Sequence, residues 1–206
     1  MTCKPGSIYY LLFTSFEIYC YSLRTSEKEV LMNIGILEHM EAPELREYLR
    51  FLLWHYRVVD GFWFLCVEEN YGRKAAEHLD EVVWGKIAGM SARDLVKRFN
   101  IEEKGLKGLV KAFQYLPWTM IVGYHVSEQG EDEVLVTVPE CPTQVARVKY
   151  GLPEFHCQDM HQAEFESFAH AIDPDIRVEC LLAPPDHPPD LFCKWKFTMK
   201  TVSRQS

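Results

Sequence analysis

The sequence predicts an α+β domain in which an N-terminal helical layer packs on a C-terminal antiparallel sheet of about four strands. Apolar residues recur every three or four positions from residue 43 to residue 116, which is the period of a helix. After Pro117 the period changes to two, with one helical segment between two alternating regions. Helices followed by neighbouring hairpins are typical of α+β folds, and the predicted order of the second half is ββαββ.

The helical half is predicted to begin at Pro43, because proline is favoured in the first turn of a helix. Asp60 and Gly61 are expected to interrupt this helix. Residues 62–67 are apolar on nearly every side, which predicts a central, enclosed helix. Gly72 ends that apolar run, and helical periodicity then resumes.

The sheet half is predicted to contain two hairpins and one helix after Pro117. The helix covers residues 164–172 and ends at Asp173 and Pro174, because proline disfavours helix in the residue before it. The strands are rich in β-branched residues or alternate apolar with polar side chains. They are expected over residues 119–127, 133–138, 176–182 and 191–199.

Composition and charge exclude several classes of protein. The chain has 206 residues, of which 48% are hydrophobic and 13% aromatic, as expected for a folded chain. Its net charge of −8 has the wrong sign for binding phosphate backbones, so no nucleic-acid partner is expected. The apolar run at residues 8–23 contains Glu17 and is shorter than the roughly 20 residues that span a bilayer, so no membrane partner is expected. Seven cysteines, an odd number, favour reduced thiols in the cytoplasm.

The chain is expected to hold one domain with short extensions, and a homodimer is a candidate assembly. Met32 is a candidate start of the native chain, which would leave residues 1–31 outside it. The expected parts are an apolar N-terminal extension (1–40), a single α+β ligand-binding domain (41–200) with a helical half (41–117) and a sheet half (118–200), and a tail (201–206).

Four cysteines of the sheet half are candidate metal ligands, namely Cys141, Cys157, Cys180 and Cys193, with His156 as a further ligand. Thiolates suit zinc, and iron is the second candidate. Alternation predicts that Cys180 and Cys193 face inward, and symmetric closure of the last loop would place them opposite each other. Two other interpretations stay open, namely buried reduced thiols and a disulfide between Cys180 and Cys193.

A nucleophilic cysteine would need a base within hydrogen-bond reach. Cys157 and Cys180 are the candidate nucleophiles, and Glu179 is a further catalytic candidate, although it is most simply a solvated strand residue. His156 adjoins Cys157, but neighbours on a strand or helix point in different directions. His125, on the first predicted strand, is therefore the candidate inward-facing histidine and ligand-binding residue, with an ordinary core or edge histidine as the alternative.

Glu68 and Glu69 follow the most apolar predicted helix, where a buried carboxylate must be paired or have a raised pKa. We expect one of them to be exposed and the other to meet Arg73, Lys74 or another cation. Tryptophans are the candidate wall of an apolar ligand pocket, with core packing as the alternative. The candidates are Trp63, Trp84 and Trp195.

Three stretches carry a family resemblance, namely DGFWFLCVEENYGRKAAEHLDEVVW, CPTQVARVKYGLPEFHC and FESFAHAIDPDIRVECLLAPPDHPPDLFCKWKF. The chain resembles a cytosolic branch of the L-2-amino-thiazoline-4-carboxylic acid hydrolase-like proteins and, more distantly, the 4-vinyl reductase domain. The resemblance covers about residues 45–200. It implies a small-molecule pocket between helices and sheet, with cysteines implicated in metal binding. The matching positions are Cys141, Cys157, Cys180 and Cys193, with Arg147, Glu179 and Trp195 nearby.

The first functional expectation is therefore a cytosolic small-molecule-binding protein with a cysteine-based zinc site. The alternative is a hydrolase that opens a cyclic amidine such as L-2-amino-thiazoline-4-carboxylate, with Arg147 holding the substrate carboxylate. A third interpretation is a structural role in which the thiols only pack or bind structural zinc.

Overall fold

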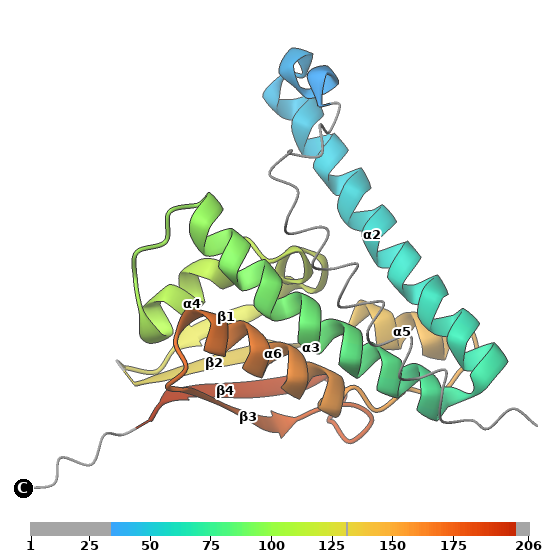
Figure 1. Cartoon of the computed structure of the whole chain (residues 1–206). Coiled ribbons are helices and arrows are strands. Elements are labelled where there is room, and N and C mark those ends of the chain that lie inside the picture. The colour runs from blue at the N-terminus through green and yellow to red at the C-terminus, as the bar shows by residue number, and fades with distance from the viewer. Residues whose placement is uncertain (1–33, 131, 201–206) are drawn as a thin grey trace, which may run out of the picture. The chain divides into compact units, whose positions relative to one another are not determined.

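Residues 34–130 and 132–200 are described by the computed structural model (Figure 1), so most of the expected extension and the whole tail lie outside the described residues. The chain divides into two compact units, Met1–Tyr48 and Leu49–Ser206. In the first unit, a short 3-10 helix, η1 (Gly35–His39), precedes the start of α2 (Ala42–Tyr71). The backbone N–H of Glu41 donates to Oε2 of Glu44 at 2.9 Å, which satisfies one free donor at that helix start.

The second unit has the predicted α+β architecture, with helices before and between the strands of one antiparallel sheet. The sheet order is β1-β2-β4-β3, so β4 of the last hairpin pairs with β2 of the first hairpin. After α2 the elements are α3 (Arg73–Arg98), α4 (Gly105–Phe113), the π-helical turn η2 (Thr119–Gly123), β1 (His125–Glu128), β2 (Glu133–Val138), α5 (Pro142–Lys149), α6 (Gln158–Ile172), β3 (Ile176–Leu182) and β4 (Cys193–Met199).

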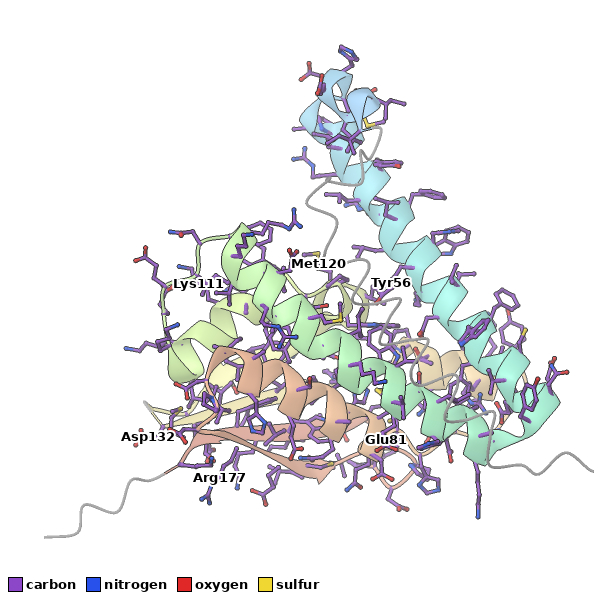
Figure 2. All side chains as sticks on the ribbon, viewed as in Figure 1. Tyr56, Glu81, Lys111, Met120, Asp132 and Arg177 are labelled. Carbon is purple, nitrogen blue, oxygen red and sulfur yellow. The ribbon has the colours of Figure 1, made fainter. Side chains whose placement is uncertain are left out.

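One face of the sheet is buried under α4 and α6, with α3 packed against α6 (Figure 1). On β4 the side chains of Cys193, Trp195 and Phe197 are buried, as the alternation predicted. Phe113 of α4 stacks on Phe168 of α6 with ring centroids 5.0 Å apart. The opposite face of the sheet carries polar side chains such as the exposed Arg177, labelled in Figure 2.

The predicted break at Asp60 and Gly61 is wrong, because α2 continues through both residues to Tyr71. A single glycine inside a helix costs only about 0.5–1 kcal/mol, which neighbouring turns can offset. The predicted enclosure of residues 62–67 is also wrong, since Phe62 and Trp63 are 65% and 69% exposed. This part of α2 buries one side, with Phe64 and Val67, and leaves the other side outward.

Gly72 ends α2 as expected, and its positive φ of 85° is a backbone conformation that glycine adopts without strain.

Two further differences concern local structure. The first strand is shorter than predicted, because residues 119–123 form a π-helical turn instead of a strand. The α5 helix was not predicted, although Pro142 in its first turn is a helix-start signal.

Helices α3 and α6 approach closely through small residues. A Cβ atom added to Gly85 would lie 3.2 Å from the Cβ of Ala163. A Cβ added to Gly89 would lie only 2.6 Å from Oγ of Ser167, which is closer than carbon and oxygen can approach. Glycine at position 89 therefore allows the contact between the two helices.

Within the described residues, no helix combines the length and the apolar content that crossing a bilayer requires.

Candidate functional site

A cavity of about 630 Å³ lies inside the second unit. It is bounded by α2, α3, η2, α5 and α6, and by the ends of β2 and β4 that face α5. This volume falls in the range of small-molecule binding sites, roughly 300–1,000 Å³. The cavity therefore defines the candidate site.

The wall of the cavity is mostly aromatic and apolar. Trp84 and Trp118 meet edge to face with ring centroids 5.6 Å apart. Phe64 and Phe155 pack with centroids 4.6 Å apart, and they share one buried apolar cluster with Met160 and the two tryptophans. Such a wall favours a ligand with a large apolar body.

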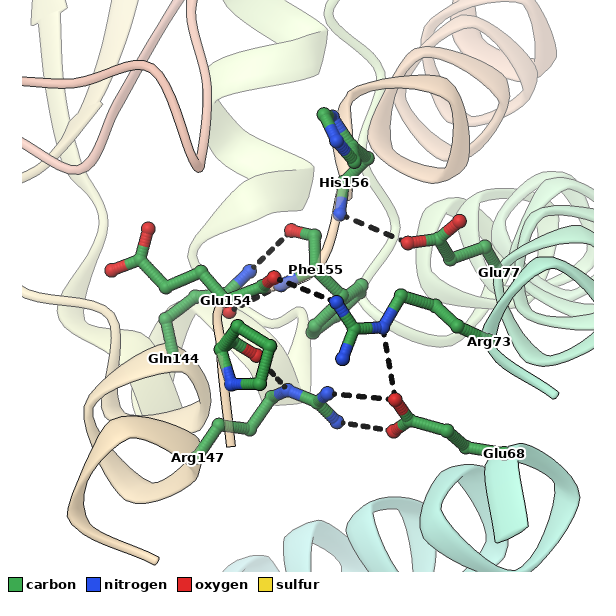
Figure 3. Close-up of polar contacts among 9 residues, drawn as sticks. Glu68, Arg73, Glu77, Gln144, Arg147, Glu154, Phe155 and His156 are labelled. Atoms are coloured by element: carbon green, nitrogen blue, oxygen red, sulfur yellow. Dashed lines mark hydrogen bonds and ion pairs between the residues drawn. The ribbon is translucent and has the colours of Figure 1, made fainter. Parts of the chain in front are cut away.

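One side of the cavity is held by an ion-pair network around Glu68 (Figure 3). Arg147 donates two hydrogen bonds to the Glu68 carboxylate, at 2.8 and 3.0 Å, and one to the carbonyl of Pro153 at 3.0 Å. Arg73 donates a further bond to Oε1 of Glu68 at 2.9 Å. The hydrogen bonds from Arg147, followed by the one from Arg73, hold the pKa of Glu68 below its ordinary value against the opposing effect of burial.

This network confirms that one of the two glutamates is paired while Glu69 is exposed. The Arg147 side chain is only 6% exposed and its guanidinium lies 5.5 and 5.3 Å from the rings of Phe64 and Phe155. The carboxylate that Arg147 binds in the structure thus belongs to the protein, where the sequence suggested a substrate carboxylate.

Gln144 fixes the segment that closes the cavity between α5 and α6. Its amide donates to the carbonyl of Phe155 at 3.0 Å and accepts from the N–H of Phe155 at 3.2 Å. The backbone N–H of His156 donates to Glu77 at 3.2 Å (Figure 3). These bonds give the cavity a preformed wall.

The predicted metal cysteines are only partly brought together. Cys141, Cys157 and Cys193 line the cavity, whereas Cys180 does not. Cys180 lies opposite Trp195, so the predicted pairing with Cys193 is wrong. The last loop does not close symmetrically, because Ala183 bridges to Asp186 and the register shifts between Cys180 and Leu182.

The geometry does not fit the predicted zinc or iron centre. Among the residues that the structure describes, no three His, Cys, Asp or Glu side chains are grouped so that they could share a metal ion. His156 is exposed.

Burial shifts the pKa values of the candidate thiols upward. Burial raises the pKa of Cys193 to about 12, and also raises those of Cys141, Cys157 and Cys180. Protonated thiols are poor nucleophiles at neutral pH. Cys157 and Cys180 therefore lack the low pKa that the candidate catalytic role requires.

The remaining predicted site residues lie in different places. Of the tryptophans, Trp84 lines the cavity, Trp195 is fully buried in the main core, and Trp63 is exposed. His125 is exposed on β1. Glu179 is exposed and forms an ion pair with Lys196 on the outer face of the sheet.

An acidic group that was not predicted lines the cavity from three helices. Asp60 of α2, Asp80 of α3 and Glu164 of α6 all line it, together with His161. Nδ1 of His161 lies 2.7 Å from Oε2 of Glu164, whose side chain is 3% exposed. Helical spacing offered a signal, because Asp60 lies four residues from the buried Phe64 and so shares its face.

The carboxyl groups of Asp60 and Asp80 have raised pKa values. Burial, followed by the charge of Glu164, raises the pKa of Asp60 to about 6. Burial, followed by the charge of Asp60, raises the pKa of Asp80 to about 7, while His161 acts in the opposite direction. Perturbed carboxyl groups in a cavity are typical of functional sites.

Together these features define an α+β domain with a largely apolar cavity, whose wall carries the buried Glu164 and the half-buried Asp60 and Asp80. The chain belongs to DUF6125, a family of unknown function whose model matches residues 44–199. None of the curated proteins matches the chain. A distant structural match is the trafficking protein particle complex subunit 3 from Naegleria fowleri, in a crystal structure covalently bound to palmitic acid. It has 12% sequence identity and a TM-score of 0.45, over 75% of this chain and 96% of that one.

Neither match supports kinship with the thiazoline hydrolase-like proteins.

Proposed function

We propose that this protein binds a small molecule in the cavity of its second unit. The observation that carries the proposal is the size of the cavity, about 630 Å³, behind a predominantly aromatic wall. Small-molecule sites in proteins are typically concave pockets of this size, lined mostly by apolar and aromatic side chains with a few polar groups. The dimensions and the lining of this pocket are those of such a site.

The cavity wall is also built to keep its shape. The Glu68–Arg147 bonds connect α2 to α5, and the Gln144–Phe155 bonds connect α5 to the segment before α6. A preformed pocket loses less conformational entropy on binding than one that must be ordered by its ligand. This supports reversible binding of a compact, apolar molecule.

The proposal keeps the small-molecule part of the sequence-based expectation. Zinc and the opening of a cyclic amidine are not part of it, because no three possible metal ligands are grouped in the described part of the chain and burial raises the pKa values of Cys157 and Cys180.

Titration of the neutral fluorescent dye Nile red tests the proposal. Gly61 lines the cavity, and a Cβ atom there would meet no atom within 4 Å, so a larger side chain can extend into the space without a backbone clash. We expect saturable binding to the wild-type chain and a loss of affinity of about tenfold or more in Gly61→Phe, since the phenyl ring occupies apolar volume that the dye needs.

The matched control is Val59→Phe, which adds the same ring to an exposed position on the same helix. It should leave the dissociation constant for Nile red close to that of the wild type. Equal affinities in Gly61→Phe and the wild type, with circular dichroism showing both folded, would locate the dye elsewhere and refute the proposal.

A further inference from the structure

We propose that the ligand of this cavity is an organic cation, an amine or quaternary ammonium with an apolar body, whose charge lies among Asp60, Asp80 and Glu164. This inference rests on the proposed function and names the chemical class of the ligand. Three helices each contribute one carboxyl group to the same cavity. The apolar wall then accommodates the rest of the molecule.

The carboxyl groups have little compensating charge of their own. In the described part of the chain, neither Asp60 nor Asp80 forms an ion pair, and Glu164 pairs with His161 alone. One imidazolium supplies at most one positive charge against three carboxylates. Charges withdrawn from solvent are normally paired, and neither aspartate has a cationic side chain within ion-pair distance among the described residues.

The two arginines on the cavity wall do not supply this charge. Arg147 is directed to Glu68, which it binds through two hydrogen bonds. Arg57 lines the cavity one turn before Asp60 but forms no ion pair with it or with any other described residue. The acidic side of the cavity is thus open to a cation from outside.

Aromatic rings stand beside the acidic group. Tyr56 of α2, labelled in Figure 2, packs with its ring centroid 6.2 Å from Trp84 and 5.9 Å from Trp118. The two indoles line the cavity and meet each other edge to face. Tryptophan and tyrosine faces attract ammonium groups, and cages of such rings bind quaternary amines.

The wall also holds an unpaired polar group. The indole N–H of Trp118, a residue 9% exposed on the cavity wall, forms no hydrogen bond of ordinary geometry with the described residues, although it lies close enough to the Tyr56 side chain to oppose the rise in the pKa of that tyrosine. A buried unpaired donor costs about 1–3 kcal/mol. An oxygen atom on a bound molecule would accept from it.

The electrostatics of neighbouring groups agree with this geometry. Burial, then the charges of Asp60 and Glu164, raises the pKa of Tyr56 to about 12, and burial and Glu164 raise that of Tyr124 well above its ordinary value. Both shifts reflect an environment that disfavours further negative charge. A bound cation would relieve the repulsion among the carboxylates.

Calorimetric titration with three ligands of one apolar body tests the charge. The probes are phenylhexylamine, phenylhexanol and phenylhexanoate. At about pH 8, where both aspartates are mostly ionised, we expect the amine to bind at least about tenfold more tightly than the alcohol, and the acid most weakly. Equal affinities for amine and alcohol would overturn the cation proposal while leaving the proposed function intact.

Isosteric variants test the residues. Asp60→Asn and Asp80→Asn should each lower the ratio of amine to alcohol affinity by about fivefold or more, because each removes one carboxylate. The control Glu69→Gln removes an exposed carboxylate from the same helix as Asp60 and should keep the wild-type ratio. An unchanged ratio in both aspartate variants would refute the assignment.

The pH profile adds a readout that a purely structural role would not give. Protons compete with the amine for Asp80 and Asp60, whose pKa values are about 7 and 6. Amine affinity should therefore fall as the pH is lowered through this interval, while alcohol affinity stays constant. If neither the amine, the alcohol nor Nile red binds, the proposed function itself fails.

Discussion

At the scale of single residues, the best-supported feature is the arrangement of Glu68, Arg147 and Arg73. The planar guanidinium of Arg147 presents two parallel N–H groups to one carboxylate and lies close to two phenyl rings. A lysine could supply the charge but not the two-pronged bond. The sequence predicted that a glutamate after the apolar stretch would be paired, because a buried carboxylate needs a partner. The sequence did not predict that Arg147 is the partner of Glu68, because 79 residues separate the two.

Replacing Arg147 tests whether this network stabilises the fold. Arg147→Ala leaves a mostly buried carboxylate with one partner, and we expect a loss of about 3 kcal/mol in the free energy of unfolding. Arg147→Lys should recover only part of it. Urea denaturation measures both, with Lys149→Ala, exposed on the same helix, as a control expected within about 0.5 kcal/mol of wild type.

The same experiment has a pH dependence of known sign. The pKa of Glu68 is lowered on folding, so its stabilisation is present above the ordinary value of 4.5 and is lost as the pH falls through the folded value. Wild type and Arg147→Ala should therefore converge in acid. A constant difference between them at all pH values would show that the loss comes from packing and not from the ion pair.

At the scale of secondary-structure elements, regular patterns were predictable and close packing was not. The bounds of β3 and the end of α6 follow from alternation and from Pro174, and the structure confirms both. The short α5 was missed because its position depends on tertiary contacts, above all those of Gln144 and Arg147. The register of Cys180 was missed because the final loop is asymmetric.

The contact between α3 and α6 gives a prediction at this scale. Gly89→Ala would place a methyl group 2.6 Å from Oγ of Ser167, which must rotate away, and 3.2 Å from the Ser167 carbonyl oxygen, so the helices must shift by a few tenths of an ångström, at a cost of about 1 kcal/mol. Gly61→Ala is the matched control, because that glycine is also inside a helix but has no atom near its added Cβ. It should raise stability by about 0.5–1 kcal/mol.

Thermal and urea unfolding of the two alanine variants separate packing from helix propensity. Stabilisation by both substitutions would mean that α3 and α6 do not approach as closely as described.

At the scale of the whole molecule, the candidate site is built from segments that lie far apart in the sequence. Its acidic group joins Asp60, Asp80 and Glu164, and the cavity also includes Cys193. A single sequence shows each of these residues as a polar or small position on its own helix or strand. Only the packing of the helices on the sheet shows that they line one cavity. The sequence therefore pointed to the cysteines as site residues and gave no indication that the three carboxyl groups meet. Membership of DUF6125 names no activity, so the functional account depends on this cavity.

The most direct test of the central claim is a crystal structure of the protein grown with phenylhexylamine. The account predicts electron density for the ligand inside the cavity, with its nitrogen about 3 Å from a carboxylate oxygen of Asp60, Asp80 or Glu164 and near the indole rings. A cavity without ligand density, in a crystal where the amine is bound elsewhere on the protein, would contradict it.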